Sequence, residues 1–383
     1  MNETELLDIL ARGEDSRHQF KSNISNVDAL AAELVAFANS GGGLLIIGVS
    51  DLGEVQGLSA ADMSRLNQLL SNAASQSVRP LIHPISLNIR TAQGLVMVIQ
   101  TLEGLNRPYT DQQGRIWVKS GADKRHVTAR EEMQRMFQQA GLIYADEVPV
   151  ASATVADIDR PALEEYFENR YRQPLEETGS SLARLLQNMG LARDGVLTLA
   201  GVLLFTKKPE RFRPAFMIKA VAIPGGELHE TSYLDSEDIF DRLAGQYQRS
   251  LAFIRRNLHH VQGDQGVNSL DILEIPEIVF QELLVNALIH RDYFISAPIR
   301  VVVLADRVEI SNPGHLPNHL NVEQIRYGLS NMRNPLLASH ATHLLPYRGL
   351  GNGIPRALNA CPRLELVDDR IGNQFKAIIP RRA

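Results

Sequence analysis

Three consecutive glycines at residues 41–43 separate two apolar segments, and this arrangement constrains the first third of the chain more than any other feature. Residues 28–39 carry apolar side chains at helical spacing, which predicts an amphipathic helix that ends at the glycines. Residues 44–49 form a near-continuous apolar run, as expected for a central strand covered on both faces. A helix that turns through glycines into a buried strand favours a layered α+β fold.

Helix and strand patterns continue along the chain and indicate more than one domain. Apolar runs at 85–89 and 95–101 predict a hairpin, and residues 238–258 and 276–290 are typical of helices. Low periodicity near Pro149 marks a boundary. We therefore expect an N-terminal domain over 1–143, a linker over 144–158, an intermediate α/β region over 159–270 and a C-terminal domain over 271–383.

Composition excludes several classes of protein. The 383 residues include 39 Lys and Arg against 44 Asp and Glu, a net charge of −5, so any nucleic acid must bind at a local patch. The single cysteine, Cys361, excludes a disulfide framework and a thiolate zinc site. No apolar stretch reaches the ~18 residues of a membrane span, and the first residues include early acids rather than a long apolar run. We therefore expect a cytoplasmic protein without a signal peptide.

A polar stripe lies on the predicted helix 276–290. Glu282, Asn286 and His290 recur every four residues, so their side chains share one face of the helix. An asparagine amide oxygen can bind Mg²⁺, and a carboxylate one turn away can orient or deprotonate a water molecule. This spacing alone is common on solvated helix faces, so it needs support from elsewhere in the chain.

Two later segments supply that support. Residues 312–314, Asn-Pro-Gly, follow a predicted strand and predict a tight turn with a polar side chain. Residues 349–353 alternate glycine with other residues and precede a predicted helix. Glycines let backbone N–H groups approach phosphate, and the start of a helix favours negative charge. The three segments in this order are far more specific than any one of them.

The set resembles the motifs of the GHKL ATPases, most closely the divergent RecG-like ATP-binding domain. Residues 282–293 resemble the family's N box, 312–317 and 349–353 its two glycine boxes, and 333–335 an internal motif beside the lid. The resemblance implies a GHKL-like α/β sandwich that binds ATP and Mg²⁺. It also implies that Glu282 is the catalytic residue that activates water and that Asn286 holds the metal.

The resemblance assigns further residues to the nucleotide: Asn286, His290, Asn312, Gly314, Arg333, Asn334, Gly349, Gly351 and Gly353. The chain departs from the family at one of them. Ordinary GHKL proteins have Asp at the adenine-contacting position, and Asn312 stands nearest to it here. This departure leaves both the selectivity for ATP and its turnover open.

The N-terminal third resembles the Schlafen AlbA-like domain, the usual companion of this GHKL-like module. The matching segments include residues 18–21, 36–43, 45–49 and 118–121. Some Schlafen proteins are RNases, and their carboxylate triad resembles Glu14, Gln19 and Asp51 in position, with Lys21 nearby. Because Gln19 is not an acid, a divalent metal should bind weakly there, and we expect nuclease activity to be absent or very weak.

Cations also cluster on and after the predicted strand 115–119, around Trp117. Lys and Arg near an aromatic ring can combine phosphate contacts with base stacking; the alternative is a solvated strand end with Trp117 in the core. We predict nucleic-acid binding at these residues, called the cationic strip below: Arg115, Lys119, Lys124 and Arg125. A second basic cluster at 207–213 is more typical of a solvated turn.

The leading hypothesis is a cytoplasmic regulator that binds ATP and nucleic acid, with slow ATPase activity left open, as in the bacterial transcriptional regulators that it resembles. One alternative is a Schlafen-like RNA or DNA nuclease under nucleotide control, with a role in phage defence left open. Another is a non-catalytic, nucleotide-gated scaffold. We expect ATP or ADP and DNA or RNA as partners, no membrane, and leave a homo-oligomer open. Since the chain stops soon after 375–379, we expect no winged helix.

Overall fold

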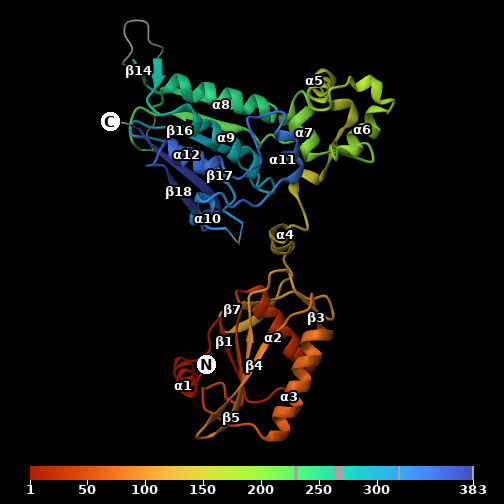
Figure 1. Cartoon of the computed structure of the whole chain (residues 1–383), viewed down its shortest axis with the longest axis vertical. Helices are drawn as coiled ribbons and strands as arrows, with labels where there is room; N and C mark the ends of the chain where they lie inside the picture. The colour runs from red at the N-terminus through yellow and green to blue at the C-terminus, as the bar shows by residue number, and fades with distance from the viewer. Residues whose placement is uncertain (228–231, 263–270, 318–319, 382–383) are drawn as a thin grey trace. The chain divides into compact units, whose positions relative to one another are not determined.

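The computed structural model describes residues 1–227, 232–262, 271–317 and 320–381, in two compact units, Met1–Ile143 and Tyr144–Ala383 (Figure 1). Both units mix helices with strands, which confirms the α+β class. Among the described residues, no helix has the length and apolar character needed to cross a bilayer.

Unit 1 is a sheet covered by helices on both faces. Its helices are α1 (Glu3–Arg12), α2 (Val27–Asn39), α3 (Ala60–Asn72) and α4 (Arg130–Gln139). Its strands are β1 (His18–Lys21), β2 (Gly43–Ile47), β3 (Val78–Arg79), β4 (Ile85–Thr91), β5 (Gly94–Thr101), β6 (Thr110–Asp111), β7 (Trp117–Ser120) and β8 (Asp123–His126). The main sheet has the order β1-β2-β5-β4, with β1 and β2 parallel and the other pairs antiparallel.

The glycines at 41–43 form the predicted junction between α2 and β2. Gly41 and Gly42 adopt left-handed φ angles of 97° and 79°, and a Cβ on Gly43 would lie 2.3 Å from the Phe37 ring. Strand β2 is buried on both faces, with Leu45 and Ile47 packed toward α2 and Ile46 packed toward α1. The predicted helix, glycine turn, central strand and 85–101 hairpin are therefore confirmed.

The described part of unit 2 contains a six-stranded sheet, a three-stranded sheet and a two-stranded sheet. Its helices are α5 (Arg160–Tyr171), α6 (Leu182–Asn188), α7 (Leu199–Phe205), α8 (Leu243–Asn257), α9 (Glu277–His290), α10 (Val322–Arg326), α11 (Pro335–Ala341) and α12 (Gly353–Ala360). Its strands are β9 (Pro149–Thr154), β10 (Ala192–Arg193), β11 (Val196–Thr198), β12 (Ile218–Ala222), β13 (Asp235–Ile239), β14 (His260–Gln262), β15 (Asp271–Leu273), β16 (Ile299–Val303), β17 (Arg307–Pro313), β18 (Glu365–Asp369) and β19 (Gln374–Pro380).

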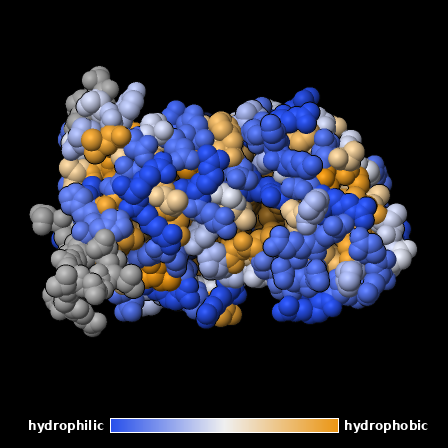
Figure 2. Space-filling model, turned by 90° about the horizontal axis from the view of Figure 1, so that it is seen from above, coloured by the Kyte–Doolittle hydropathy of each residue, from blue (hydrophilic) through white to orange (hydrophobic). Residues whose placement is uncertain are grey.

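The six-stranded sheet has the order β13-β12-β16-β17-β19-β18, and only β12 and β16 are parallel. Helix α9 packs on β17 and lies between α8 and α12 (Figure 1). Both edge strands carry several acids, which discourage pairing with another sheet edge. The face of unit 2 that carries α8 is mainly hydrophilic, with apolar side chains in separate small groups (Figure 2).

Three sequence-based expectations differ from the structure. Residues 144–158 were expected as a linker but contain β9, which pairs with β11 and buries Val150 and Ala153 in the core. The regions 159–270 and 271–383 share one hydrophobic core and one sheet rather than forming separate parts. The predicted helix 238–258 begins only at Leu243, because Asp235–Ile239 pairs with β12 as a strand.

A buried carboxylate, Asp146, joins the start of unit 2 to helix α11. Its side chain is fully buried and accepts a hydrogen bond from the Leu337 backbone N–H at 2.9 Å. Its Oδ1 atom has no hydrogen-bond partner. Burial raises the pKa of Asp146 from its ordinary 3.8 to about 7, since an ionised carboxylate is poorly solvated there.

We expect the free energy of unfolding of Asp146→Asn to increase relative to that of wild type as pH rises from about 4 to 7. In this range folded Asp146 retains a proton that the unfolded chain has lost, so its contribution to the free energy of unfolding falls as pH rises. The difference between variant and wild type should grow by up to about 1.4 kcal/mol per pH unit. Urea unfolding at several pH values measures it.

The comparison must be between the two proteins, because His290 and His340 act in the opposite direction. Burial lowers the pKa of each histidine to about 4. Their contributions to the free energy of unfolding therefore fall as pH falls toward that value, because the unfolded chain binds protons that the folded chain does not. Both contributions cancel in the difference between Asp146→Asn and wild type. A difference that does not change with pH would contradict the buried, proton-holding state of Asp146.

Candidate functional site

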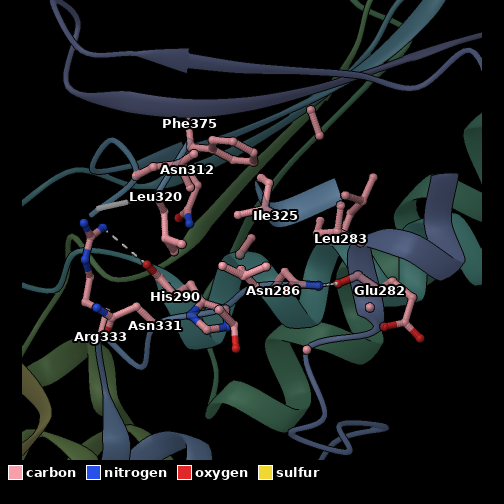
Figure 3. Close-up of a pocket in the computed structure, with 18 of the residues that line it drawn as sticks. Glu282, Leu283, Asn286, His290, Asn312, Leu320, Ile325, Asn331, Arg333 and Phe375 are labelled. Carbon is pink, nitrogen blue, oxygen red and sulfur yellow. Dashed lines mark hydrogen bonds between the residues drawn. The ribbon is translucent and has the colours of Figure 1, made fainter. Parts of the chain in front are cut away.

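A pocket in unit 2 collects most of the residues that the sequence singled out. It lies between α9, the ends of β17 and β19, and the loops that flank α10 and precede α12 (Figure 3). Among the predicted nucleotide residues, those that line it are Glu282, Asn286, His290, Asn312, Gly314, Arg333, Gly349, Gly351 and Gly353. Segments up to about 70 residues apart thus meet at one cavity, as their order in the sequence suggested.

The polar stripe of α9 faces this pocket, although most of the helix is buried among apolar side chains. Asn286 donates a hydrogen bond from Nδ2 to the Glu282 backbone carbonyl at 2.7 Å. This bond fixes the amide and leaves its Oδ1 atom available as an oxygen ligand. The geometry therefore fits the metal-binding role predicted for Asn286.

Glu282 has a partner that the sequence analysis missed. Its carboxylate forms an ion pair with Arg356, which lies in the first turn of α12. A Cβ on Gly353 would come within 2.7 Å of Glu282 Oε2 and 2.8 Å of Asn286 Nδ2, so a larger residue at 353 would have to displace these side-chain ends. The sequence shows an arginine three residues after the glycine loop, but it does not show which carboxylate that arginine pairs with.

Asn312 lies at a different structural position from the predicted turn. It belongs to β17, pairs in register with Phe375 of β19, and is only 7% exposed. Its Oδ1 atom is buried without a hydrogen-bond partner, which is costly unless a ligand supplies a donor. Apolar side chains surround this part of the pocket: Ile310, Leu316, Leu320, Ile325, Leu329, Phe375 and Ala377.

His290 and Arg333 form the far end of the pocket (Figure 3). Arg333 donates from Nη2 to the His315 carbonyl at 2.8 Å and from Nη1 to the His290 carbonyl at 3.4 Å. Burial and the Arg333 charge lower the pKa of His290 to about 4, so its ring is neutral at pH 7. Gly314 passes so close to Arg333 that a Cβ would lie 2.6 Å from Nη1.

Asn334 does not line the pocket, in contrast to the prediction. It is fully buried and donates from Nδ2 to the carbonyls of Ile289 and Arg291, at 2.8 and 2.9 Å. These bonds hold the C-terminal end of α9 and give Asn334 a supporting role. Gly349 and Gly351 do lie at the pocket, with left-handed φ angles of 67° and 71° that favour glycine.

In unit 1, two of the predicted nuclease residues belong to a compact polar network. Gln19 donates from Nε2 to Glu14 Oε1 at 2.5 Å, and the same oxygen accepts the Phe20 backbone N–H. Lys119 donates from Nζ to Gln19 Oε1 at 2.6 Å. An ammonium group thus lies beside Gln19 and Glu14, near where the resemblance would put a metal.

The other two nuclease candidates are not joined to that network by any described hydrogen bond. Asp51 is exposed in the turn after β2, and Lys21 is half-buried at the end of β1. Within the described ranges, no group of three or more His, Cys, Asp or Glu side chains could hold a metal ion.

In the cationic strip, where we predict nucleic-acid binding, each cation lies beside a carboxylate. The Lys119 side chain is only 1% exposed, 3.9 Å from Glu33, and its pKa is lowered by burial. Lys124 pairs with Glu33 at 2.6 Å, and the two more exposed members, Arg115 and Arg125, pair with Asp111 and Glu132. All four charges already have carboxylate partners, because the fold brings acids from other elements to them.

Comparison with known families matches two separate parts of the chain, one in each unit. Residues 14–128 match the "Schlafen, AlbA_2" model, and residues 296–378 match a model described as "Putative ATP-dependent DNA helicase recG C-terminal". The chain carries a Schlafen AlbA_2 domain followed by a RecG-type ATPase-like domain. Together they indicate a nucleic-acid-related, ATP-binding protein. The second match begins after α9, so the roles of Glu282 and Asn286 rest on geometry and resemblance.

No curated protein matches the chain. Two solved structures are similar to it at low identity. The DIP2311 protein from Corynebacterium diphtheriae shares 22% identity over 99% of this chain and 81% of its own, with a TM-score of 0.47. The N-terminal domain of a RecG-related protein from Nitrosomonas europaea shares 23% identity over 34% of this chain and 91% of its own, with a TM-score of 0.25.

We predict that Lys119→Met destabilises the AlbA_2 domain by about 2 to 3 kcal/mol, because it leaves Gln19 Oε1 and the Ala122 carbonyl without the buried ammonium group that donates to both. Arg125→Gln is the matched control in the same strip. The Arg125 side chain is 48% exposed, so the loss of its ion pair should cost less than about 1 kcal/mol. Urea unfolding measures both, and equal midpoints would contradict the buried position of Lys119.

Proposed function

We propose that the ATPase-like domain binds ATP or ADP with Mg²⁺ in the pocket beside α9. The observation that carries this proposal is the unpartnered Oδ1 of Asn312 among apolar walls. A planar base with an exocyclic amino group would fill the apolar space and donate the missing hydrogen bond. A bare apolar ligand would leave Asn312 unsatisfied, which disfavours it.

The remaining pocket residues fit the phosphates and the metal. The loop Gly349–Gly353 and the first turn of α12 offer backbone N–H groups, since Asn352 makes no side-chain cap there. Asn286 Oδ1 would hold Mg²⁺, which neutralises charge on phosphate oxygens when bound. Glu282 is the candidate that orients or deprotonates water, and its carboxylate pairs with Arg356 in the pocket without nucleotide. We propose that any hydrolysis is slow.

Mg-ATP should raise the melting temperature of the wild-type protein, corresponding to about 2.7 kcal/mol of stabilisation at a hundredfold excess over Kd. Asn286→Ala should reduce the benefit of adding Mg²⁺, and Asn312→Leu should abolish binding of the base. Gln281→Ala is the control, because it removes an amide from the same helix outside the pocket. Calorimetry and thermal shift, each with and without Mg²⁺, measure these effects.

Two results would contradict this proposal. The absence of any response by wild type at millimolar Mg-ATP would remove the nucleotide from the function. An equal loss in Asn286→Ala and Gln281→Ala would show that the first variant acts through helix stability rather than the metal. Glu282→Ala should still bind ATP while losing hydrolysis, because a water-orienting group acts on the chemical step.

We further propose that the AlbA_2 domain binds DNA or RNA and that the whole protein acts as a nucleotide-responsive regulator. The match to the AlbA_2 model supports the nucleic-acid role. Lys21 is a better phosphate contact than the cationic strip, since no carboxylate pairs with it among the described residues. Lys207 and Lys208 are exposed and likewise lack an ion pair within the described part of unit 2.

If this assignment holds, Lys21→Gln should lower the log–log salt slope of nucleic-acid binding by about 0.7 to 0.9, the contribution of one phosphate contact. Arg125→Gln should change the slope much less, because Glu132 already neutralises Arg125. Lys207→Gln with Lys208→Gln tests the second cluster. Fluorescence anisotropy with single-stranded RNA and duplex DNA at several salt concentrations measures the slopes.

A slope that falls only in Arg125→Gln would restore the cationic strip as the contact surface. No binding by wild type at low salt would leave a nucleotide-gated scaffold as the better hypothesis. Cleavage of the same substrates with Mn²⁺, lost in Glu14→Ala, would instead establish the nuclease.

A further inference from the structure

The ion pair between Glu282 and Arg356 links a residue that lines the pocket to the first turn of α12. Glu282 is on α9 and Arg356 is on α12, directly after the glycine loop. The Glu282 side chain is 8% exposed and the Arg356 side chain 35% exposed. The pair is therefore closed on the α9 side and open to solvent on the α12 side.

Arg356 is only partly satisfied in this state. Its Nε atom is buried and has no hydrogen-bond partner. A guanidinium presents several donors in a fixed plane, and phosphate oxygens accept two of them at once. The terminal phosphates of a nucleotide held at the glycine loop would bring such oxygens beside the first turn of α12, which contains Arg356.

We propose that Arg356 exchanges partners: it holds Glu282 when the pocket is empty and turns to the nucleotide phosphates when they arrive. The proposal rests on the nucleotide site proposed above and deepens it. It makes Arg356 a phosphate-recognition residue and makes Glu282 available to water only when phosphate is present. The nucleoside part of the ligand, which occupies the apolar end of the pocket, is not affected by this exchange.

The exchange has a thermodynamic consequence, because phosphate must compete with Glu282 for Arg356. Removing the charge of Glu282 removes the competitor. Glu282→Gln should therefore bind ATP about tenfold more tightly than wild type, while adenosine should bind equally to both. Arg356→Gln should weaken ATP but leave adenosine unchanged, and Arg356→Lys should recover part of the preference for ATP, since a lysine still offers a point charge.

A double-mutant cycle decides between this exchange and simple charge repulsion. If Arg356 carries the effect, Glu282→Gln should give no gain in ATP affinity in an Arg356→Gln background. If the carboxylate merely repels the phosphates, the gain should persist or grow in that background, which would overturn the proposal. Arg363→Gln is the matched control, because Arg363 is exposed just after α12 and, among the described residues, forms no ion pair with Glu282.

Calorimetric titration of the full chain with Mg-ATP and with adenosine provides the affinities, and unfolding without ligand confirms that each variant is folded. Unchanged ATP affinity in Glu282→Gln would also overturn the exchange. If wild type binds neither adenosine nor ATP, the nucleotide site is refuted, and the exchange with it. Binding of ATP with no difference among the variants refutes the exchange alone.

Discussion

A polar stripe on an otherwise buried helix is the constraint on which the ATPase-like domain depends. Helix α9 buries apolar residues against the sheet and against α8. A carboxylate, an amide and an imidazole on the same helix cannot remain in that interior without partners. Glu282 forms an ion pair with Arg356, and the Asn286 amide donates to the Glu282 backbone carbonyl. The His290 ring is neutral, which avoids a buried charge. The approach of α12 and its glycine loop to α9 follows from the same need.

The AlbA_2 domain also buries a charged group that needs partners, but here the group is a cation. Its interior cation, Lys119, is held by Gln19, the Ala122 carbonyl and the nearby Glu33. The result is a polar network centred on a cation beside Glu14. Both domains leave a buried oxygen without a hydrogen-bond partner: Glu33 Oε2 near Lys119 in the AlbA_2 domain, and Asn312 Oδ1 in the ATPase-like domain. The Asn312 residue lines a pocket, where a ligand could supply the missing donor.

Several features could be predicted because they depend on neighbours in sequence. The α2 helix, its glycines and strand β2 follow from local periodicity and from the left-handed φ angles at Gly41 and Gly42. The common face of Glu282 and Asn286 follows from helical spacing alone. Other expectations failed where distant pairing decided the outcome. Residues 235–239 are a strand because β12 lies beside them, and 144–158 is not a linker because β11 pairs with β9.

The sequence by itself determined the α+β class, the order of the two domains and the residues that face the pocket from α9, because helical and strand periods are properties of consecutive residues. Only the tertiary structure decided which charges are free. Ion pairs join residues far apart in the chain, such as Lys124 with Glu33 and Arg356 with Glu282. A cluster of cations in the sequence is therefore no evidence of a cationic surface until the fold shows where the carboxylates lie.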